Sequence, residues 1–342
     1  MKKRNLIKLV SACMSCLLLT TPLCSAVNTI ESNSKKENIK NTVLKVGGTI
    51  AGLVGLAALA GVLYNKFSSD SNAKSNNTGT TTCKQIFDSS TAPSTFEENF
   101  LSFKGTSKPS RCFFADPLNN THILMSRINF LKGHVRVVQE SVVGKNFLRQ
   151  IGSNGYTVVV NAANSSGEAG RGVCGTIFEE MGIGSTVPEV RDWKIKTNAN
   201  EIGTGNVFIH PPYDLGKKVE SVKYIMQTVG PNFGEYSLKN IGEAYEKLYE
   251  AYYNTIILSA LKRTKNVVIP AISMGIFADG AKENPKDLGG KCSIVALTAI
   301  ADALNTLECW GIQIQDFRVY LCDCRSKAAA ISFFNKCKEL LN

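Results

Sequence analysis

The sequence contains little histidine, since His122, His134 and His210 are its only three. None of them lies in a recognisable catalytic triad, and His210, which two prolines follow, is expected in an exposed loop. The cysteines lack zinc-site spacing, because only one residue separates Cys322 from Cys324, where a CxxC pair has two. We therefore expect no metal, no cofactor and no histidine-based mechanism.

A concentrated basic stripe is also missing, although the formal net charge is +11. Lysine and arginine interleaved with aromatic rings would indicate nucleic-acid binding. Here much of the excess charge lies in the first residues and in scattered lysines. This distribution argues against nucleic acid as a partner, while a modest attraction for an anionic nucleotide remains.

Residues 1–26 have the pattern of a secretory signal peptide. Basic residues at the start precede an apolar run from Leu9 to Leu19, and the small residues Ser25 and Ala26 follow. We expect cleavage after Ala26. An uncleaved signal anchor is the alternative.

A second apolar stretch, Val46 to Tyr64, contains no charge and is long enough to cross a bilayer. It predicts a transmembrane helix over residues 44–65, with a buried soluble helix as the alternative. Residues 66–82, rich in Ser, Asn and Thr, form a predicted linker. Residues 83–132 are an N-terminal extension whose phenylalanines predict packing against the core, and whose prolines argue against long regular elements.

These segments predict a protein that is anchored in the membrane after an export signal, with its C-terminal domain facing a cytosol. Buried thiols would suit that side, whereas an exported domain would often pair its cysteines in disulfides. A secreted form, or one delivered into a host cell, is the alternative.

From His134 onward, strand and helix patterns alternate. The expected strands are Val135–Val138, Thr157–Val160, Lys223–Thr228, Asn266–Pro270 and Phe317–Leu321. The expected helices are Val173–Met181, Ile241–Lys262, Ser293–Leu307 and Ser326–Leu341. Such alternation predicts an α/β fold in which helices cover both faces of a sheet, with ligands bound beyond the strand ends.

The stretch from Asn161 to Ile177 carries the most chemical information. It places an Asn-Ala-Ala-Asn turn and a glycine-rich loop between a strand and a helix. The free N–H groups of a helix N-terminus attract anions, and glycines let the backbone approach phosphate oxygens closely. Taken alone, the stretch is equally typical of an ordinary turn.

Three further motifs change that balance. Ile202 to Asn206 is a Thr-Gly turn, Gln227 to Pro231 reads Gln-Thr-Val-Gly-Pro, and Ile269 to Phe277 contains a Pro-x-Ile-Ser-x-Gly-x-Phe loop. In this order, the four motifs resemble those of the macro domain, the ADP-ribose-binding module. The resemblance covers residues from about 135 to 340. It implies a three-layer α/β/α fold with a mixed sheet and a macro domain over residues 133–342.

The resemblance also implies a binding site. Asn161 and Asn164 supply fixed donors and acceptors, and Asn164 would hold the distal ribose of ADP-ribose. The remaining contacts would come from the backbone of the first loop, from the N–H groups of the second loop, and from an aromatic ring against the distal ribose. These residues are Gly170, Arg171, Gly172 and Val173 in the first loop, Ser273, Met274, Gly275 and Ile276 in the second, and Phe277 for the ring.

Three positions depart from the family pattern. Cys174 stands where many hydrolytic members have Asp. A thiol of ordinary pKa is a poor base, but a position near a helix N-terminus could lower its pKa and make Cys174 catalytic, with a buried inert thiol as the alternative. The loop carries Glu168 and Arg171 where the family often has glycines, so Glu168 is a conceivable replacement base, with a solvated loop charge as the alternative. At the position of the family's adenine-binding Asp, this chain has Ser141, with Glu140 beside it.

The sequence therefore predicts a domain that binds ADP-ribose or ADP-ribosylated protein. It would hydrolyse ADP-ribose esters, either on protein carboxylates or in O-acetyl-ADP-ribose, with Asn164 in the catalytic site. A non-catalytic reader of ADP-ribose or poly(ADP-ribose) is the alternative. A pocket redirected to another nucleotide or to an RNA end is the third possibility.

Overall fold

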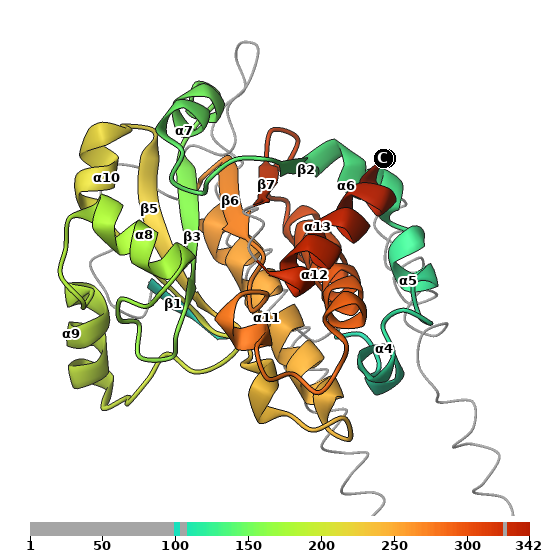
Figure 1. Ribbon diagram of the computed structural model, residues 1–342. Helices are drawn as coiled ribbons and strands as arrows, with labels where there is room; N and C mark the ends of the chain where they lie inside the picture. Colours follow the sequence, from blue (N-terminus) through green and yellow to red (C-terminus); the bar gives the residue numbers. More distant parts are fainter. Residues whose placement is uncertain (1–98, 103–107, 324–326) are drawn as a thin grey trace, which may run out of the picture. The chain divides into compact units, whose positions relative to one another are not determined.

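The computed structural model describes residues 99–102, 108–323 and 327–342 (Figure 1). The predicted signal peptide, transmembrane segment and linker lie outside these residues. They therefore stay predictions, as does the predicted domain division.

A mixed sheet of seven strands forms the centre of the described fold, in the order β1-β4-β5-β3-β6-β7-β2. Strands β5, β3, β6, β7 and β2 run parallel, whereas β4 is antiparallel to β5 and β1 is antiparallel to β4. The strands are β1 (Phe100–Leu101), β2 (Val135–Val138), β3 (Thr157–Ala163), β4 (Val207–His210), β5 (Val222–Val229), β6 (Asn266–Pro270) and β7 (Arg318–Cys322).

Both faces of the sheet are buried, which explains the nearly unbroken apolar strands. Side chains alternate along a strand, so Val158 and Val160 enter one hydrophobic cluster and Val159 enters the other. Each cluster also contains residues from a separate set of helices. The expectation of a mixed α/β fold with helices on both faces is confirmed.

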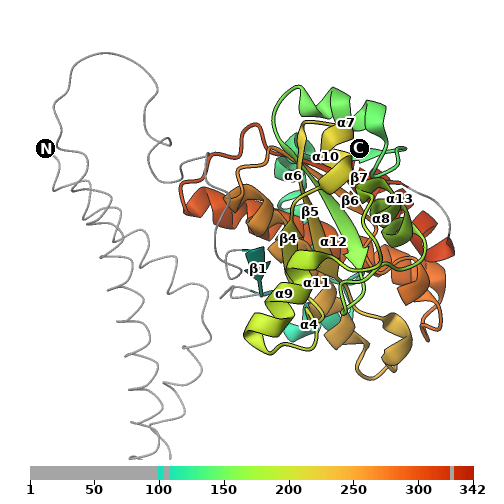
Figure 2. The same cartoon turned by 90° about the vertical axis from the view of Figure 1, so that its left-hand side faces the viewer.

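The helices of the larger cluster lie on the right of the sheet in Figure 1. They are α4 (Arg111–Ala115), α5 (His122–Met125), α6 (Ile128–His134), α11 (Ile241–Leu261), α12 (Pro285–Cys309) and α13 (Ala328–Leu341). The other set lies on the left of Figure 1, and its α8 and α9 stand in front of the strands in Figure 2. It comprises α7 (Lys145–Gly152), α8 (Val173–Met181), α9 (Pro188–Thr197) and α10 (Tyr213–Lys218).

The described part of the N-terminal extension is built into the larger cluster. Phe113 and Phe114 are buried, and Phe114 makes an edge-on ring contact with Tyr249 of α11. Arg127 forms an ion pair with Asp302 of α12. A fully buried phenylalanine stabilises a fold by about 2 kcal/mol, so these helices contribute to the core rather than merely covering it.

Among the described residues, α12 is the one helix long and apolar enough to pass a test for a membrane span. Of its most apolar window, 72% is buried inside the fold. That burial identifies α12 as the central helix of a globular core.

The strands Val135–Val138 and Asn266–Pro270 have the predicted bounds. Helix α12 begins at Pro285, earlier than the predicted Ser293, because Asn284 caps it and Pro285 occupies its first turn. The expectation of an exposed loop at His210 was wrong. His210 ends β4 and is only 1% exposed, since β4 lies between β5 and β1.

Candidate functional site

The loops that follow β3, β5 and β6 lie at one edge of the sheet, because these three strands are parallel and adjacent. A Cβ placed on Gly230, after β5, would lie 2.5 Å from Ile272 Cγ2, after β6. The 3-10 helices η3 (Phe233–Glu235) and η4 (Ile276–Ala278) extend this contact, since a Cβ on Gly234 would lie 3.0 Å from the Asp279 carbonyl oxygen. The structure therefore brings the loops after β5 and β6 into contact.

The loop after β6 presents its backbone to open space. Gly275 is the N-cap of η4, and no described atom lies within 4 Å of a Cβ built on it. Ser273 has φ of +66°, which turns the chain sharply. Within the described part of the chain, no acceptor is found for the backbone N–H groups of Ser273, Gly275 or Ile276. Met274 differs from its expected role, since its N–H donates to the Ala271 carbonyl at 3.2 Å.

The loop after β3 has the same character where α8 begins. Gly172 is the N-cap of α8 with φ of +66°, and a Cβ built on it meets no described atom within 4 Å. Gly175 has to be glycine for packing, because its Cβ would lie 2.7 Å from the Gly170 carbonyl oxygen. The first turn of a helix leaves N–H groups without intrahelical partners. The backbone near Val173 is therefore open to an anion.

Asn164 shapes the first loop in this structure. Its Oδ1 accepts hydrogen bonds from Ser166 Oγ at 2.7 Å and from Glu168 N at 3.1 Å. Its Nδ2 donates to the Glu168 carbonyl at 3.1 Å, which leaves the second N–H of the amide for a ligand. Asn164 is thus held in place before any ribose binds.

Cys174 lies beneath this loop and is 6% exposed. Its Sγ accepts hydrogen bonds from Gly170 N at 3.2 Å and from Asn161 Nδ2 at 3.3 Å, and it donates to the Glu168 carbonyl at 3.6 Å. Burial raises the pKa of the thiol, although these two N–H donors oppose the shift. Cys174 is therefore a protonated thiol at neutral pH and is unsuited to act as a base.

Glu168 and Arg171 are exposed on the same loop. The Glu168 backbone forms an isolated β-bridge with Thr186, and Ala169 N donates to the Ser185 carbonyl at 2.7 Å. The segment before α9 thus fixes the loop backbone while the carboxylate of Glu168 stays on the surface. Phe277, on η4, is half-buried, and Ile276 beside it is 52% exposed.

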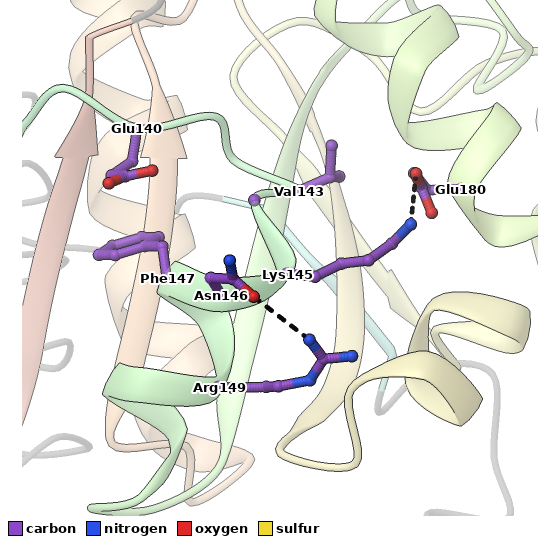
Figure 3. Close-up of a pocket in the computed structure, with 8 residues that line it drawn as sticks. Glu140, Val143, Lys145, Asn146, Phe147, Arg149 and Glu180 are labelled. Carbon is purple, nitrogen blue, oxygen red and sulfur yellow. Dashed lines mark hydrogen bonds and ion pairs between the residues drawn. The ribbon is translucent and has the colours of Figure 1, made fainter.

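Glu140 and Ser141 lie between β2 and α7. Glu140 lines a shallow hollow of about 460 Å³ between α7 and the C-terminal end of α8 (Figure 3). Lys145 reaches across this hollow to an ion pair with Glu180, at 3.1 Å. Ser141 instead stabilises the turn before α7, since its carbonyl accepts from Gly144 N at 2.9 Å.

Two residues that sequence reasoning did not assign to the site extend a chain of hydrogen bonds from Asn161. Gln227 Oε1 accepts from Asn161 Nδ2 at 2.7 Å, and Gln227 Nε2 lies 2.8 Å from His210 Nε2. Asn161 and Gln227 face each other in register on β3 and β5. The position of Gln227 in the Thr-Val-Gly-Pro motif was a usable signal, whereas nothing local to His210 indicated its partner. No described group of His, Cys, Asp and Glu has the arrangement of a metal site.

Comparisons with known proteins identify the family of this chain. The macro domain family matches residues 160–283. An uncharacterized protein of Fusobacterium nucleatum is 35% identical over 168 residues, which are 47% of this chain and 82% of that protein. An uncharacterized protein of Pyrobaculum aerophilum is 31% identical over 150 residues, which are 44% of this chain and 71% of that protein. This chain belongs to the macro domain family.

The chain is also similar to a viral polyprotein and to macrodomains of known structure. Polyprotein P1234 of Aura virus is 30% identical over 164 residues, which are 46% of this chain and 5% of the polyprotein. The macrodomain of Oceanobacillus iheyensis, solved with ADP, is 21% identical, with a TM-score of 0.42 over 60% of this chain and 91% of that chain. The Trypanosoma brucei macrodomain, solved with ADP-ribose, is 18% identical, with a TM-score of 0.40 over 61% of this chain and 69% of that chain.

Proposed function

We propose that this protein binds ADP-ribose at the edge of the sheet formed by the loops after β3 and β6. The observation that carries the proposal is the open space at Gly172 and Gly275, each at the N-cap of a helix. Two such backbone turns at one edge provide N–H donors for a diphosphate. Membership in the macro domain family supports ADP-ribose as the molecule that carries this diphosphate.

In this arrangement the diphosphate lies on the N–H groups of Ser273, Gly275 and Ile276. The distal ribose lies between Asn164, which has one N–H to donate, and the half-buried ring of Phe277. The N-terminus of α8 adds a partial positive charge near the phosphates. Adenine would lie toward Ser141 and Glu140, at the end of β2.

We further propose that the site hydrolyses ADP-ribose esters. A water molecule would attack either C1″ of the distal ribose or the carbonyl carbon of the ester on that ribose. Either attack releases ADP-ribose and a carboxylate. Glu168 is the side chain suited to accept the proton from that water, because its carboxylate is exposed on the loop that bears Asn164. The phosphate of the substrate is the other acceptor within the same site.

One observation favours the alternative of a reader that binds without cleaving. Cys174, at the position where hydrolytic relatives carry an acid, is a buried thiol whose pKa is raised. The first loop therefore offers no buried base. Binding and turnover need separate tests for this reason.

Calorimetric titration with ADP-ribose tests the binding proposal. The Gly275→Glu variant places a carboxylate in open space, so the fold is kept while the cradle becomes negative. We expect micromolar binding in the wild type and none in this variant. The Gly275→Gln variant, with nearly the same size and no charge, separates repulsion from steric blocking. A wild-type protein that binds no ADP-ribose would refute the proposal.

Single-turnover release of ADP-ribose from a carboxylate-linked substrate tests hydrolysis. We expect slow release that is lost in Asn164→Ala and reduced about 100-fold in Glu168→Gln if Glu168 is the base. Tight binding with no release at high protein concentration would identify a reader.

We also propose that residues 44–65 anchor the protein in a membrane and leave the macro domain facing a cytosol. Alkaline extraction of membranes would retain the wild-type protein and release a variant that lacks these residues. Release of both proteins would contradict the anchor.

A further inference from the structure

A buried chain of polar side chains crosses the sheet beneath the ligand loop. It begins at His210 on β4, passes through Gln227 on β5 and Asn161 on β3, and ends at Cys174 on α8. All four residues are at most 6% exposed. Polar groups buried in this way are costly unless their hydrogen bonds are made, so the chain has to be held in a definite arrangement.

The direction of every hydrogen bond in the chain follows from His210. Its Nδ1 lies 2.8 Å from the Pro211 carbonyl oxygen, which can only accept, so Nδ1 carries the proton. Burial lowers the pKa of His210 to about 4, and the ring is therefore neutral at physiological pH. Its Nε2 must then accept, which turns the Gln227 Nε2 toward it and leaves the Gln227 Oε1 to accept from Asn161.

The orientation of Asn161 is thereby fixed with its Nδ2 toward Cys174. The thiol then holds two backbone groups of the ligand loop, the N–H of Gly170 and the carbonyl of Glu168. The same Glu168 carbonyl accepts from Asn164. The chain therefore runs without interruption from His210 to the side chain expected to hold the ribose.

We propose that Gln227 and His210 are positioning residues, which set the Gly170 amide and the Asn164 side chain for the ligand without touching it. This inference rests on the proposed binding of ADP-ribose at the loop. Gln227 is the central member, because its amide donates to the neutral His210 ring through Nε2 and accepts from Asn161 through Oε1.

The neighbouring residue Thr228 provides a matched control. Its Oγ1 is hydrogen-bonded to Thr255 Oγ1 at 3.0 Å, and both residues are buried. Because side chains alternate along β5, Thr228 faces α11 on the side of the sheet away from the chain. Thr228→Val removes one buried hydrogen bond from the same strand and leaves the chain intact.

The experiment compares Gln227→Met with Thr228→Val by calorimetry with ADP-ribose, by thermal unfolding and by the NMR resonance of the Gly170 amide. We expect both variants to unfold at a lower temperature. Only Gln227→Met should move the Gly170 resonance and weaken ADP-ribose binding, by about tenfold.

Two outcomes would overturn the proposal. One is an unmoved Gly170 resonance with wild-type affinity in Gln227→Met, and the other is an equal loss of affinity in Thr228→Val. If Gln227→Met does not fold, His210→Phe keeps a ring beside Tyr213 but gives Gln227 no acceptor, and the same shift is expected. If the wild type binds no ADP-ribose, the proposed function fails, while the Gly170 resonance still decides whether the chain positions the loop.

Discussion

The hydroxyl oxygen of Ser273 lies only 2.2 Å from where a methyl group on Gly230 would be. Gly230 directly follows β5 and Ser273 follows β6, so this approach presses one loop of the proposed phosphate site against its neighbour. Ser273 also has a left-handed backbone, with φ of +66°, and is 5% exposed. Its freedom to move away is therefore limited.

This relationship predicts that Gly230→Ala displaces the second loop. We expect ADP-ribose affinity to fall at least about tenfold and the free energy of unfolding to fall by about 2 kcal/mol. Calorimetry and urea unfolding measure the two effects. Gly184→Ala is the control, since its Cβ meets no described atom within 4 Å. Unchanged binding in Gly230→Ala would show that the loop does not depend on this contact.

The second prediction concerns His210 and acid pH. Its pKa is about 4 in the fold and 6.5 in the unfolded chain, so between these values the unfolded chain binds more protons. The contribution of the neutral His210 ring to the free energy of unfolding is fully present above about pH 6.5 and is lost as pH falls toward about 4. It amounts to about 3 kcal/mol. Urea unfolding at about pH 7 and about pH 5 should show this slope.

His210→Gln removes the titrating ring and should flatten that dependence. The exposed His122 offers a matched substitution, His122→Gln, which should leave it in place. Equal slopes in His210→Gln and the wild type would contradict the assignment of the buried neutral ring.

How far the sequence predicts this fold depends on how local each signal is. The apolar strands and the helix Val173–Met181 follow from patterns within a few residues and agree with the structure. The burial of His210 does not, because it depends on β4 pairing with β5 and on the side chain of Gln227, 17 residues later in the chain. The candidate loops were found as motifs. The hydrogen bonds that join Asn164, Cys174 and Glu168 leave no pattern in the sequence, because they run between side chains and the backbone of Glu168.

The ion pair between Arg127 and Asp302 predicts that the extension stabilises the domain. Burial raises the pKa of Asp302, while Arg127 and the Tyr249 hydroxyl oppose that shift. Arg127→Met would leave a carboxylate that is only 14% exposed without its cation, at a cost of about 2 kcal/mol near neutral pH.

The same variant should recover part of its stability in acid. Without Arg127 the pKa of Asp302 rises further in the folded state, so that state binds a proton more readily as pH falls, and the deficit shrinks. Urea unfolding across pH measures this. Asp302→Asn combined with Arg127→Met should lose less than Arg127→Met alone, and strictly additive losses would show that the pair does not interact.

The burial of Phe113 predicts that this part of the N-terminal extension stabilises the fold. This ring is fully buried and contacts Phe114 edge-on, with 5.2 Å between ring centroids. Phe113→Ala should destabilise the fold by about 4 kcal/mol, measured by urea unfolding. Met125→Ala, at a side chain that is 50% exposed, should cost far less. A loss in Phe113→Ala as small as that in Met125→Ala would show that the Phe113 ring contributes little to stability.

The last prediction asks whether Cys174 limits hydrolysis. Its Sγ already accepts hydrogen bonds from Gly170 N and Asn161 Nδ2, and the N-terminus of α8 lies beside it. Donors of this kind stabilise a negative charge, so a carboxylate in the same place would be held ionised. We therefore expect Cys174→Asp to increase single-turnover release of ADP-ribose.

The control for that increase is Cys174→Asn, which has the shape of the aspartate and no charge. Both variants lose the thiol, and only the Asn amide keeps a donor for the Glu168 carbonyl, so a difference between them reports the charge together with that donor. An increase in Cys174→Asp only would mean that the loop is arranged for hydrolysis and is limited by its missing base. If neither variant releases ADP-ribose while both still bind it, the site is a reader whose limitation lies elsewhere in the loop.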